Sequence, residues 1–139
     1  MSVSYTILPD LGIHYVRYEG HHQTNQTDLL IKDYRRDRMV RAGLRSVLDF
    51  SRILSAELDI SKRRKQMDAL YGLFKDPAVD WCITYYCPTE VSRGLTEMQQ
   101  KMWEARPDVD FLLATKIESI ATKLDVPVKV IRDLVNYEE

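Results

Sequence analysis

The sequence has 139 residues, which is the size of one ordinary domain, and its 45% hydrophobic content is enough to form a core. Twenty lysines and arginines against 21 aspartates and glutamates leave a net charge of −1. That balance excludes a polybasic protein with a wholly phosphate-seeking surface, and it excludes an acidic disordered tail.

Three further absences narrow the class of protein. Two cysteines are too few for a disulfide scaffold. The longest apolar runs are only a few residues, too short to cross a bilayer, so we expect no transmembrane segment. The N-terminal residues lack the layout of a signal peptide, and we therefore expect a cytoplasmic protein.

The N-terminal part of the chain predicts a β-hairpin followed by a helix. Residues 3–7 alternate between apolar and polar side chains, which is the period of a half-buried strand. Residues 13–19 repeat this character after turn-forming residues at 9–12, so the two strands are expected to pair. Capping residues at 24–28 then predict a helix that runs to about Arg36.

The middle of the chain predicts two strands around a helix. Residues 46–50 are a short, nearly continuous apolar run, which is typical of a central strand buried on both faces. A helix is predicted from about Asp59 or Ser61, with apolar residues at helical spacing up to Phe74. Residues 81–87 predict the next strand, because they are rich in aromatic and β-branched side chains.

The last third predicts three helices and one strand. The third helix opens at residues 88–90, and a strand is predicted at 109–114. Thr115 and Glu118 fit a capping box for the next helix, and a final helix is predicted from Pro127. The expected buried stripe of the third helix is Val91, Leu95, Met98 and Met102.

The predicted fold class is α/β. Strands that alternate with helices pair in parallel through crossovers, so we expect a mixed sheet with an N-terminal hairpin, then parallel β-α units, and helices packed on the sheet. Residues 1–126 would form this domain. Residues 127–139 would be a C-terminal helical extension that packs on the same domain.

Particular residues at the joints of these elements resemble a known family. They are Tyr15–Gly20, Val47–Ser51, Tyr85–Pro88, Gly94, Phe111–Ala114 and Ile117–Leu124. Together, over about residues 5–125, they resemble the SpoIIAA-like branch of the STAS fold, the anti-sigma-factor antagonists. The chain is most similar to uncharacterised bacterial members of that branch. The resemblance implies a regulatory, protein-binding module rather than an enzyme.

The resemblance also implies a candidate phospho-acceptor. In antagonist members a partner kinase phosphorylates a serine just after the central strand, within the sequence Asp-Ser-Ser-Gly. The nearest match here is Asp59-Ile60-Ser61-Lys62, which makes Ser61 the candidate. The first serine and the glycine are replaced, and simple capping of a helix by Asp59 or Ser61 is the alternative interpretation.

The family topology places a contact surface at residues 49–64, together with the neighbouring turn at 87–90. In such sheets ligands bind at the C-terminal edge of the parallel strands. We expect an unidentified protein partner there rather than nucleic acid, and a homo-oligomer is an open alternative. The candidate contact residues are Asp49, Ser51, Asp59, Ser61, Lys62, Arg63, Cys87 and Thr89.

Basic residues gather near the first two predicted helices. Residues 62–65 are all lysine or arginine, and four arginines lie between residues 35 and 41. If both helices cover one face of the sheet, these charges would form an anion-attracting patch. The alternative is a solvated helix surface, partly neutralised by Asp33, Asp37 and Asp68.

No motif predicts a catalytic, cofactor or metal site. The chain has no phosphate-binding glycine loop and no paired metal-ligand spacing, and His21 and His22 are expected to be exposed loop residues. Cys87 precedes a helix N-terminus, where the helix dipole lowers a thiol pKa, so a reactive thiol is one alternative. Cys82 and Cys87 would face opposite sides of one strand and cannot bond to each other.

A DNA-binding transcription regulator is the second alternative. Residues 117–136 carry apolar side chains at the spacing of a helix-turn-helix. The turn position usually held by glycine is Asp125, and the second helix carries only Lys129 and Arg132 as cations. The same spacing also suits a helix that returns to the sheet and a packing tail.

Overall fold

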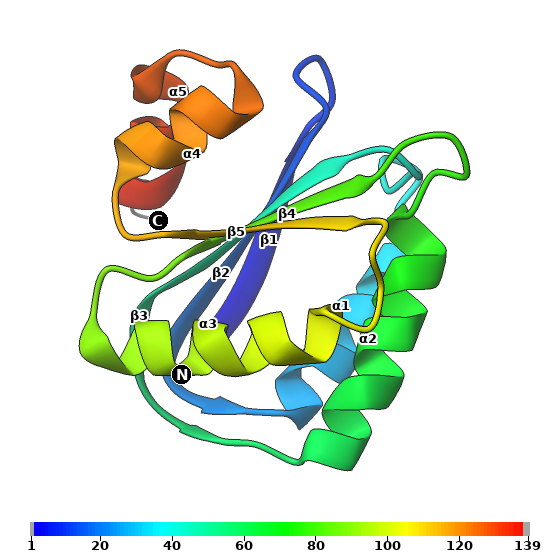
Figure 1. The fold of residues 1–139 in the computed structure, drawn as a ribbon, viewed down its shortest axis with the longest axis vertical. Coiled ribbons are helices and arrows are strands. Elements are labelled where there is room, and N and C mark those ends of the chain that lie inside the picture. Colours follow the sequence, from blue (N-terminus) through cyan, green and yellow to red (C-terminus); the bar gives the residue numbers. More distant parts are fainter. Residues whose placement is uncertain (1, 138–139) are drawn as a thin grey trace.

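The computed structural model describes residues 2–137, which form one five-stranded sheet with helices on both faces (Figure 1). None of the helices in this range is both long and apolar enough to cross a membrane. In chain order the elements are β1 (Ser2–Leu8), β2 (Ile13–Gln23), α1 (Asn25–Tyr34), β3 (Arg45–Glu57), α2 (Ile60–Phe74), β4 (Trp81–Tyr86), α3 (Glu90–Trp103), β5 (Val109–Ala114), α4 (Ile117–Leu124) and α5 (Val128–Asn136).

The strands lie in the order β1-β2-β3-β4-β5. β1 and β2 are antiparallel, with Leu8 opposite Ile13, and every other neighbouring pair is parallel. A helix connects each parallel pair, because the chain must return to the start of the sheet before the next parallel strand begins. The predicted α/β class is therefore confirmed, including the N-terminal hairpin.

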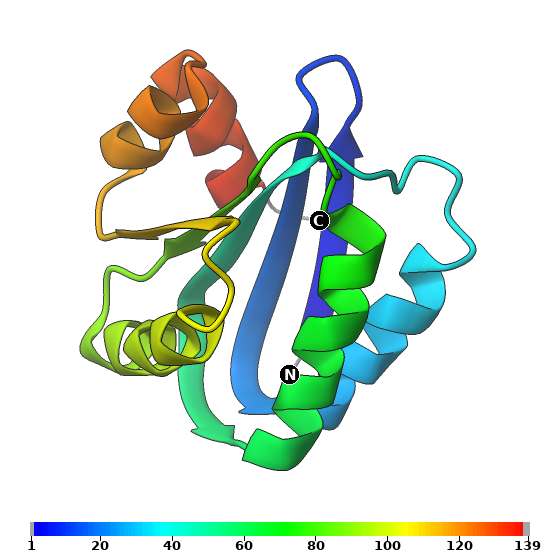
Figure 2. The same cartoon turned by 45° about the vertical axis from the view of Figure 1, so that its right-hand side comes forward.

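Two hydrophobic cores lie on opposite faces of this sheet. Helices α1, α2 and α3 cover one face and enclose the larger core, which is rich in aromatic residues such as Phe74, Trp81 and Tyr85. Helices α4 and α5 cover the other face and pack on Ile13, Val47 and their neighbours. Figure 2 shows α1 and α2 side by side, with α4 and α5 across the sheet from them.

β3 is much longer than residues 46–50, the range predicted from the apolar run. It continues to Glu57 and pairs with β2 as far as Gln23. Register shifts between Arg17 and Glu19 and between Gly20 and His21 interrupt the alternation that sequence reading depends on. β4 ends at Tyr86, which pairs with Asp49, so β3 extends roughly 25 Å beyond the end of β4 before α2 begins.

The inward face of α3 also differs from the prediction. Val91 and Met98 are exposed, while Leu95 and Met102 are only partly buried. The helix instead buries a mainly polar stripe of Ser92, Thr96, Gln99 and Trp103. Polar side chains are buried here because they have partners: the Thr96 hydroxyl donates to the Ser92 carbonyl, and Gln99 accepts from α2.

Two smaller predictions about local structure are wrong. Lys116, not Thr115, is the N-cap of α4, and it makes no side-chain cap; the capping box of this chain lies at Thr89 and Ser92 in α3. His21 and His22 belong to β2 rather than to a loop, because the β2–β3 ribbon is longer than predicted. His22 is buried, and its ring contacts Gln26 at 3.0 Å.

Candidate functional site

The predicted contact residues do not gather on one exposed surface. The extension of β3 separates the start of α2 from the turn between β4 and α3, and the side chain of Asp49 lies on the opposite face of the sheet from α2. Their locations are the β3 strand for Asp49 and Ser51, the start of α2 for Asp59, Ser61, Lys62 and Arg63, and the turn before α3 for Cys87 and Thr89.

The start of α2 borders a surface groove of about 610 Å³ between α1 and α2. This groove, here called the α1–α2 groove, contains three of the predicted contact residues. It is lined by Asp28, Ile31, Arg35, Asp59, Ser61, Lys62, Lys65, Gln66 and Ala69. Ser61 is exposed in the first turn of α2.

Hydrogen bonds hold the two helix N-termini together at one end of this groove. Asp59 caps α2 by accepting from the Lys62 backbone N–H at 3.0 Å. The Asp59 backbone N–H donates to the Thr24 hydroxyl, at the N-cap of α1. Asp59 therefore caps α2, which is the alternative interpretation of the sequence Asp59-Ile60-Ser61-Lys62.

An ion pair crosses the groove. Lys62 Nζ lies 2.8 Å from Asp28 Oδ2, and Gln66 Nε2 donates to the other Asp28 oxygen at 2.9 Å. These two donors hold the pKa of Asp28 below its usual range. Arg35 and Lys65 have no such carboxylate partner within residues 2–137. With Asp28 and Asp59 against Arg35, Lys62 and Lys65, the lining of the groove carries an excess of one positive charge.

The predicted basic patch thus forms in part. α1 and α2 do lie on one face of the sheet, and one groove is lined both by Arg35, the C-cap of α1, and by Lys65 of α2. Arg63 does not join them, because it is buried and faces the core. The basic patch therefore includes fewer cations than the four consecutive basic residues at 62–65 predict.

Asp49 belongs to a polar cluster between β3 and α5. Its side chain is fully buried and accepts hydrogen bonds from the Tyr15 hydroxyl and from the backbone N–H and hydroxyl of Ser51. Arg52 Nη1 lies 3.6 Å from Asp49 Oδ2. The Asp49 carboxylate and the Ser51 hydroxyl are therefore already used in hydrogen bonds within the protein.

Two arginines of this cluster bind the C-terminal end of α5. Arg17 donates to the carbonyls of Leu134 and Tyr137 at 2.8 and 2.6 Å, and Arg52 donates to that of Val135 at 2.8 Å. The last carbonyls of a helix lack partners within the helix and carry negative partial charge, so cations stabilise them. Sequence reading missed this role because Arg17 is far from α5 in the chain.

Cys87 is buried, contrary to the environment that a reactive thiol needs. Its Sγ lies 3.5 Å from the Ala114 carbonyl oxygen, and burial raises the pKa of the Cys87 thiol. Burial therefore favours a structural role for Cys87 over the alternative of a reactive thiol, because desolvation of the thiolate opposes any lowering of the pKa by the helix dipole. Cys82 and Cys87 are both free, as expected.

We expect Cys87 to resist iodoacetamide in the native protein at pH 7.5, since its thiol is both protonated and inaccessible. Mass spectrometry after brief labelling should find it unmodified, and labelling in 6 M guanidinium should modify it fully. Rapid native labelling of Cys87 would contradict the buried position.

The helix-turn-helix-like segment is packed on the sheet. Asp125 takes the left-handed conformation, with φ of 55°, at the end of α4. Ile131 and Val135 of α5 face the second core, and Lys129 pairs with Asp133 at 2.7 Å. Much of the limited positive charge of α5 is therefore neutralised locally.

No family model matches this chain, and a search of curated proteins finds no match to it. Within the described range, no group of three or more histidine, cysteine or acidic side chains is placed to hold a metal ion.

Proposed function

We propose that this protein is a cytoplasmic, non-enzymatic regulatory module, similar to STAS proteins, that binds an acidic segment of a partner protein in the α1–α2 groove. The observation that carries the proposal is the positive excess of that groove, where Arg35 and Lys65 have no carboxylate partner in the described chain. The groove's volume of about 610 Å³ suits a short peptide segment.

The electrostatics of the groove favour such a ligand. Arg35, the C-cap residue that follows α1, and Lys65 on α2 provide cations on both walls, and the N-terminal end of α2 adds positive partial charge. Exposed ion pairs contribute only about 0.2–1 kcal/mol each, so binding would require several of them together. Such binding is screened by salt.

Ser61 offers a means of control. Its hydroxyl is exposed within the groove, close in sequence to Lys62 and Lys65. A phosphate at this position would add nearly two negative charges, pair with the neighbouring cations and compete with an acidic partner. Phosphorylation of Ser61 would thus release the partner.

Reversing the charges of Arg35 and Lys65 (R35E/K65E) is expected to weaken binding of an acidic probe by roughly tenfold or more, because two favourable pairs become repulsive. The probe is a synthetic decamer of glutamate, measured by fluorescence anisotropy. Affinity capture from the native cell, followed by mass spectrometry, would then identify proteins that the wild type retains and the variant does not.

The matched control is K116E/R132E, which makes the same change in net charge at exposed positions on the α4–α5 side. It should bind the decamer almost as well as the wild type. Raising NaCl from 50 to 300 mM should weaken wild-type binding strongly. Equal loss in both variants, or binding that ignores salt, would contradict the proposed site.

A further inference from the structure

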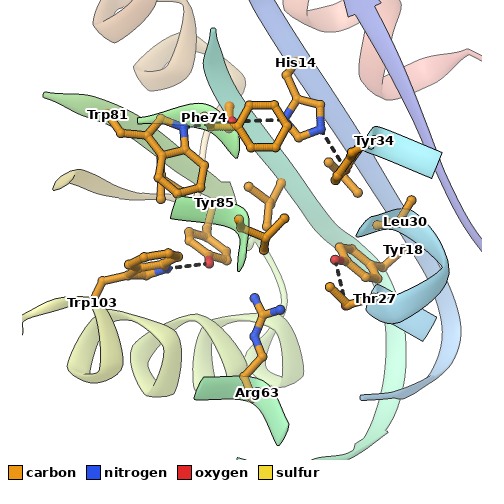
Figure 3. Close-up of a pocket in the computed structure, with 15 residues that line it drawn as sticks. His14, Tyr18, Thr27, Leu30, Tyr34, Arg63, Phe74, Trp81, Tyr85 and Trp103 are labelled. Atoms are coloured by element: carbon orange, nitrogen blue, oxygen red, sulfur yellow. Dashed lines mark hydrogen bonds between the residues drawn. The ribbon is translucent and has the colours of Figure 1, made fainter. Parts of the chain in front are cut away.

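The two faces of the sheet leave different amounts of room for a ligand. On the face covered by α1, α2 and α3, aromatic side chains and Arg63 line a cavity of about 20 Å³, which is enough for roughly one water molecule (Figure 3). On the opposite face a surface groove of about 610 Å³ lies between β1 and α5. This groove, here called the β1–α5 groove, has Ser4 and Thr6 on the β1 side and Val130, Leu134 and Tyr137 on the α5 side.

The strand that borders this groove is an edge strand. Only β2 lies beside β1 in the sheet, so within residues 2–137 no strand pairs with its outer edge. Every second residue of a strand directs its backbone N–H and carbonyl away from the neighbouring strand. Along the seven residues of β1 these groups are therefore available to an added strand.

The sequence of β1 lacks the features that commonly keep an edge strand from pairing with another chain. Such strands carry charged side chains or proline, or they contain a bulge. Residues 2–8 include no charged residue and no proline, and they pair with β2 without a register shift. The other edge strand, β5, contains Asp110, whose carboxylate lies 2.7 Å from Lys123 Nζ. β1 is therefore the edge better suited to accept another strand.

The side chains around the groove favour large apolar groups in the ligand. Ser4 and Thr6 are small and exposed, so they leave space above β1. Val130 and Leu134 of α5 are only partly buried, and Tyr137 is 62% exposed. A strand added beside β1 directs every second side chain to this face of the sheet. Large apolar side chains at those positions would reach over β1 to the apolar residues of α5.

The charged side chains of the groove already have partners. Arg17 donates to the carbonyls at the end of α5, and Asp133 lies 2.7 Å from Lys129. The groove therefore does not require a charged ligand. A second copy of β1 would bring only small serine and threonine side chains to this face, and these would leave most of the 610 Å³ unfilled.

We propose that the β1–α5 groove binds an extended, uncharged segment of a partner protein, which pairs with β1 as a sixth strand. Its large apolar side chains, at every second position, pack against Val130, Leu134 and Tyr137. In this type of recognition the backbone hydrogen bonds provide affinity, and the alternate side chains provide specificity. The site lies across the sheet from the α1–α2 groove and selects a ligand of different chemistry.

The experiment measures binding of a synthetic peptide to the full chain by fluorescence anisotropy. The probe is a labelled heptapeptide of alternating leucine and threonine with both ends blocked. Two further versions carry N-methyl groups on the backbone, one at every leucine and the other at every threonine. The unmodified peptide should bind saturably. Because only alternate residues direct their N–H toward β1, exactly one methylated version should bind roughly tenfold more weakly or worse.

Replacing Ser4 and Thr6 by lysine (S4K/T6K) places two long, charged side chains in the groove and should weaken peptide binding roughly tenfold or more. The matched control is T115K/S119K, which makes the same two substitutions at exposed positions near α4. The control should bind the peptide as the wild type does. Equal binding by S4K/T6K and the wild type would overturn the proposal.

Three other results would also overturn it. They are the absence of saturable binding, an equal effect of the two methylation patterns, and a wild-type dimer that S4K/T6K converts to a monomer in sedimentation. The last result would assign the edge of β1 to a second copy of the chain. R35E/K65E should bind the leucine–threonine peptide normally, which separates this site from the α1–α2 groove.

Discussion

Lowering the pH from 7 to 4 is expected to reduce the free energy of unfolding by about 3 kcal/mol, because His14 is buried as a neutral imidazole. Burial lowers the pKa of His14 from 6.5 to about 3. In the unfolded chain the same ring gains a proton as the pH falls through 6.5. Between these values the unfolded state binds more protons, so stability decreases as the pH falls.

The surroundings of His14 explain why its ring stays neutral. Nδ1 lies 2.9 Å from the Ser46 hydroxyl and Nε2 lies 2.7 Å from the Tyr34 hydroxyl. The ring also stacks on Phe74, with centroids 4.5 Å apart. A neutral imidazole donates from one nitrogen and accepts at the other, and these two hydroxyls can satisfy both. No carboxylate among the described contacts compensates a second proton.

Urea unfolding at several pH values tests this prediction. His14→Gln removes the titrating group, so the variant should be less stable at pH 7 but should lose less stability on acidification. His21→Gln, at an exposed histidine of the same strand, is the matched control and should keep the pH dependence of the wild type. If His14→Gln retains the full pH dependence, another group causes it.

Replacing Asp49 by alanine is expected to destabilise the protein by about 3–5 kcal/mol. The substitution leaves the Tyr15 hydroxyl, the Ser51 donors and the Arg52 guanidinium without the carboxylate that they now contact. Removing one member of a buried charged cluster lowers the free energy of unfolding by more than an exposed ion pair contributes. The reason is that the remaining polar groups stay buried without their hydrogen-bond partner.

Thermal and urea unfolding of D49A and D49N measure this effect. Asparagine keeps the shape and one acceptor oxygen, so D49N should retain more stability than D49A. Because Arg17 and Arg52 bind the end of α5, hydrogen exchange should show faster opening of α5 in D49A. A loss below 1 kcal/mol in D49A would show that the cluster contributes little.

Local pattern was sufficient to predict most of the fold. The hairpin, the sequence of strands and helices and the buried apolar residues Met67, Leu70 and Phe74 of α2 follow from periodicities that depend only on neighbouring residues. The length of β3 could not be predicted from such a periodicity, because register shifts between β2 and β3 interrupt the alternation of side chains. The buried face of α3 could not be predicted either, because it includes polar residues such as Gln99, whose partner lies on α2.

The candidate sites show the same division. Arg35, Ser61 and Lys65 could be identified as polar, exposed helix residues from sequence alone. Sequence placed Arg63 among those basic residues, although it turns inward. Its burial depends on Gln99 of α3, and no pattern within α2 signals that contact.

The sequence by itself determined the near-neutral charge, the α/β class, the order of the elements and many of the apolar residues of the two cores. Those properties are local, since backbone geometry sets the periods of strands and helices. Only the tertiary structure decided which charges are exposed and which are buried. Although the net charge is only −1, the surface has a groove with an excess of positive charge, and the core holds a separate cation. The packing of α1, α2 and α3 decides this, because it leaves Arg35 and Lys65 exposed and buries Arg63.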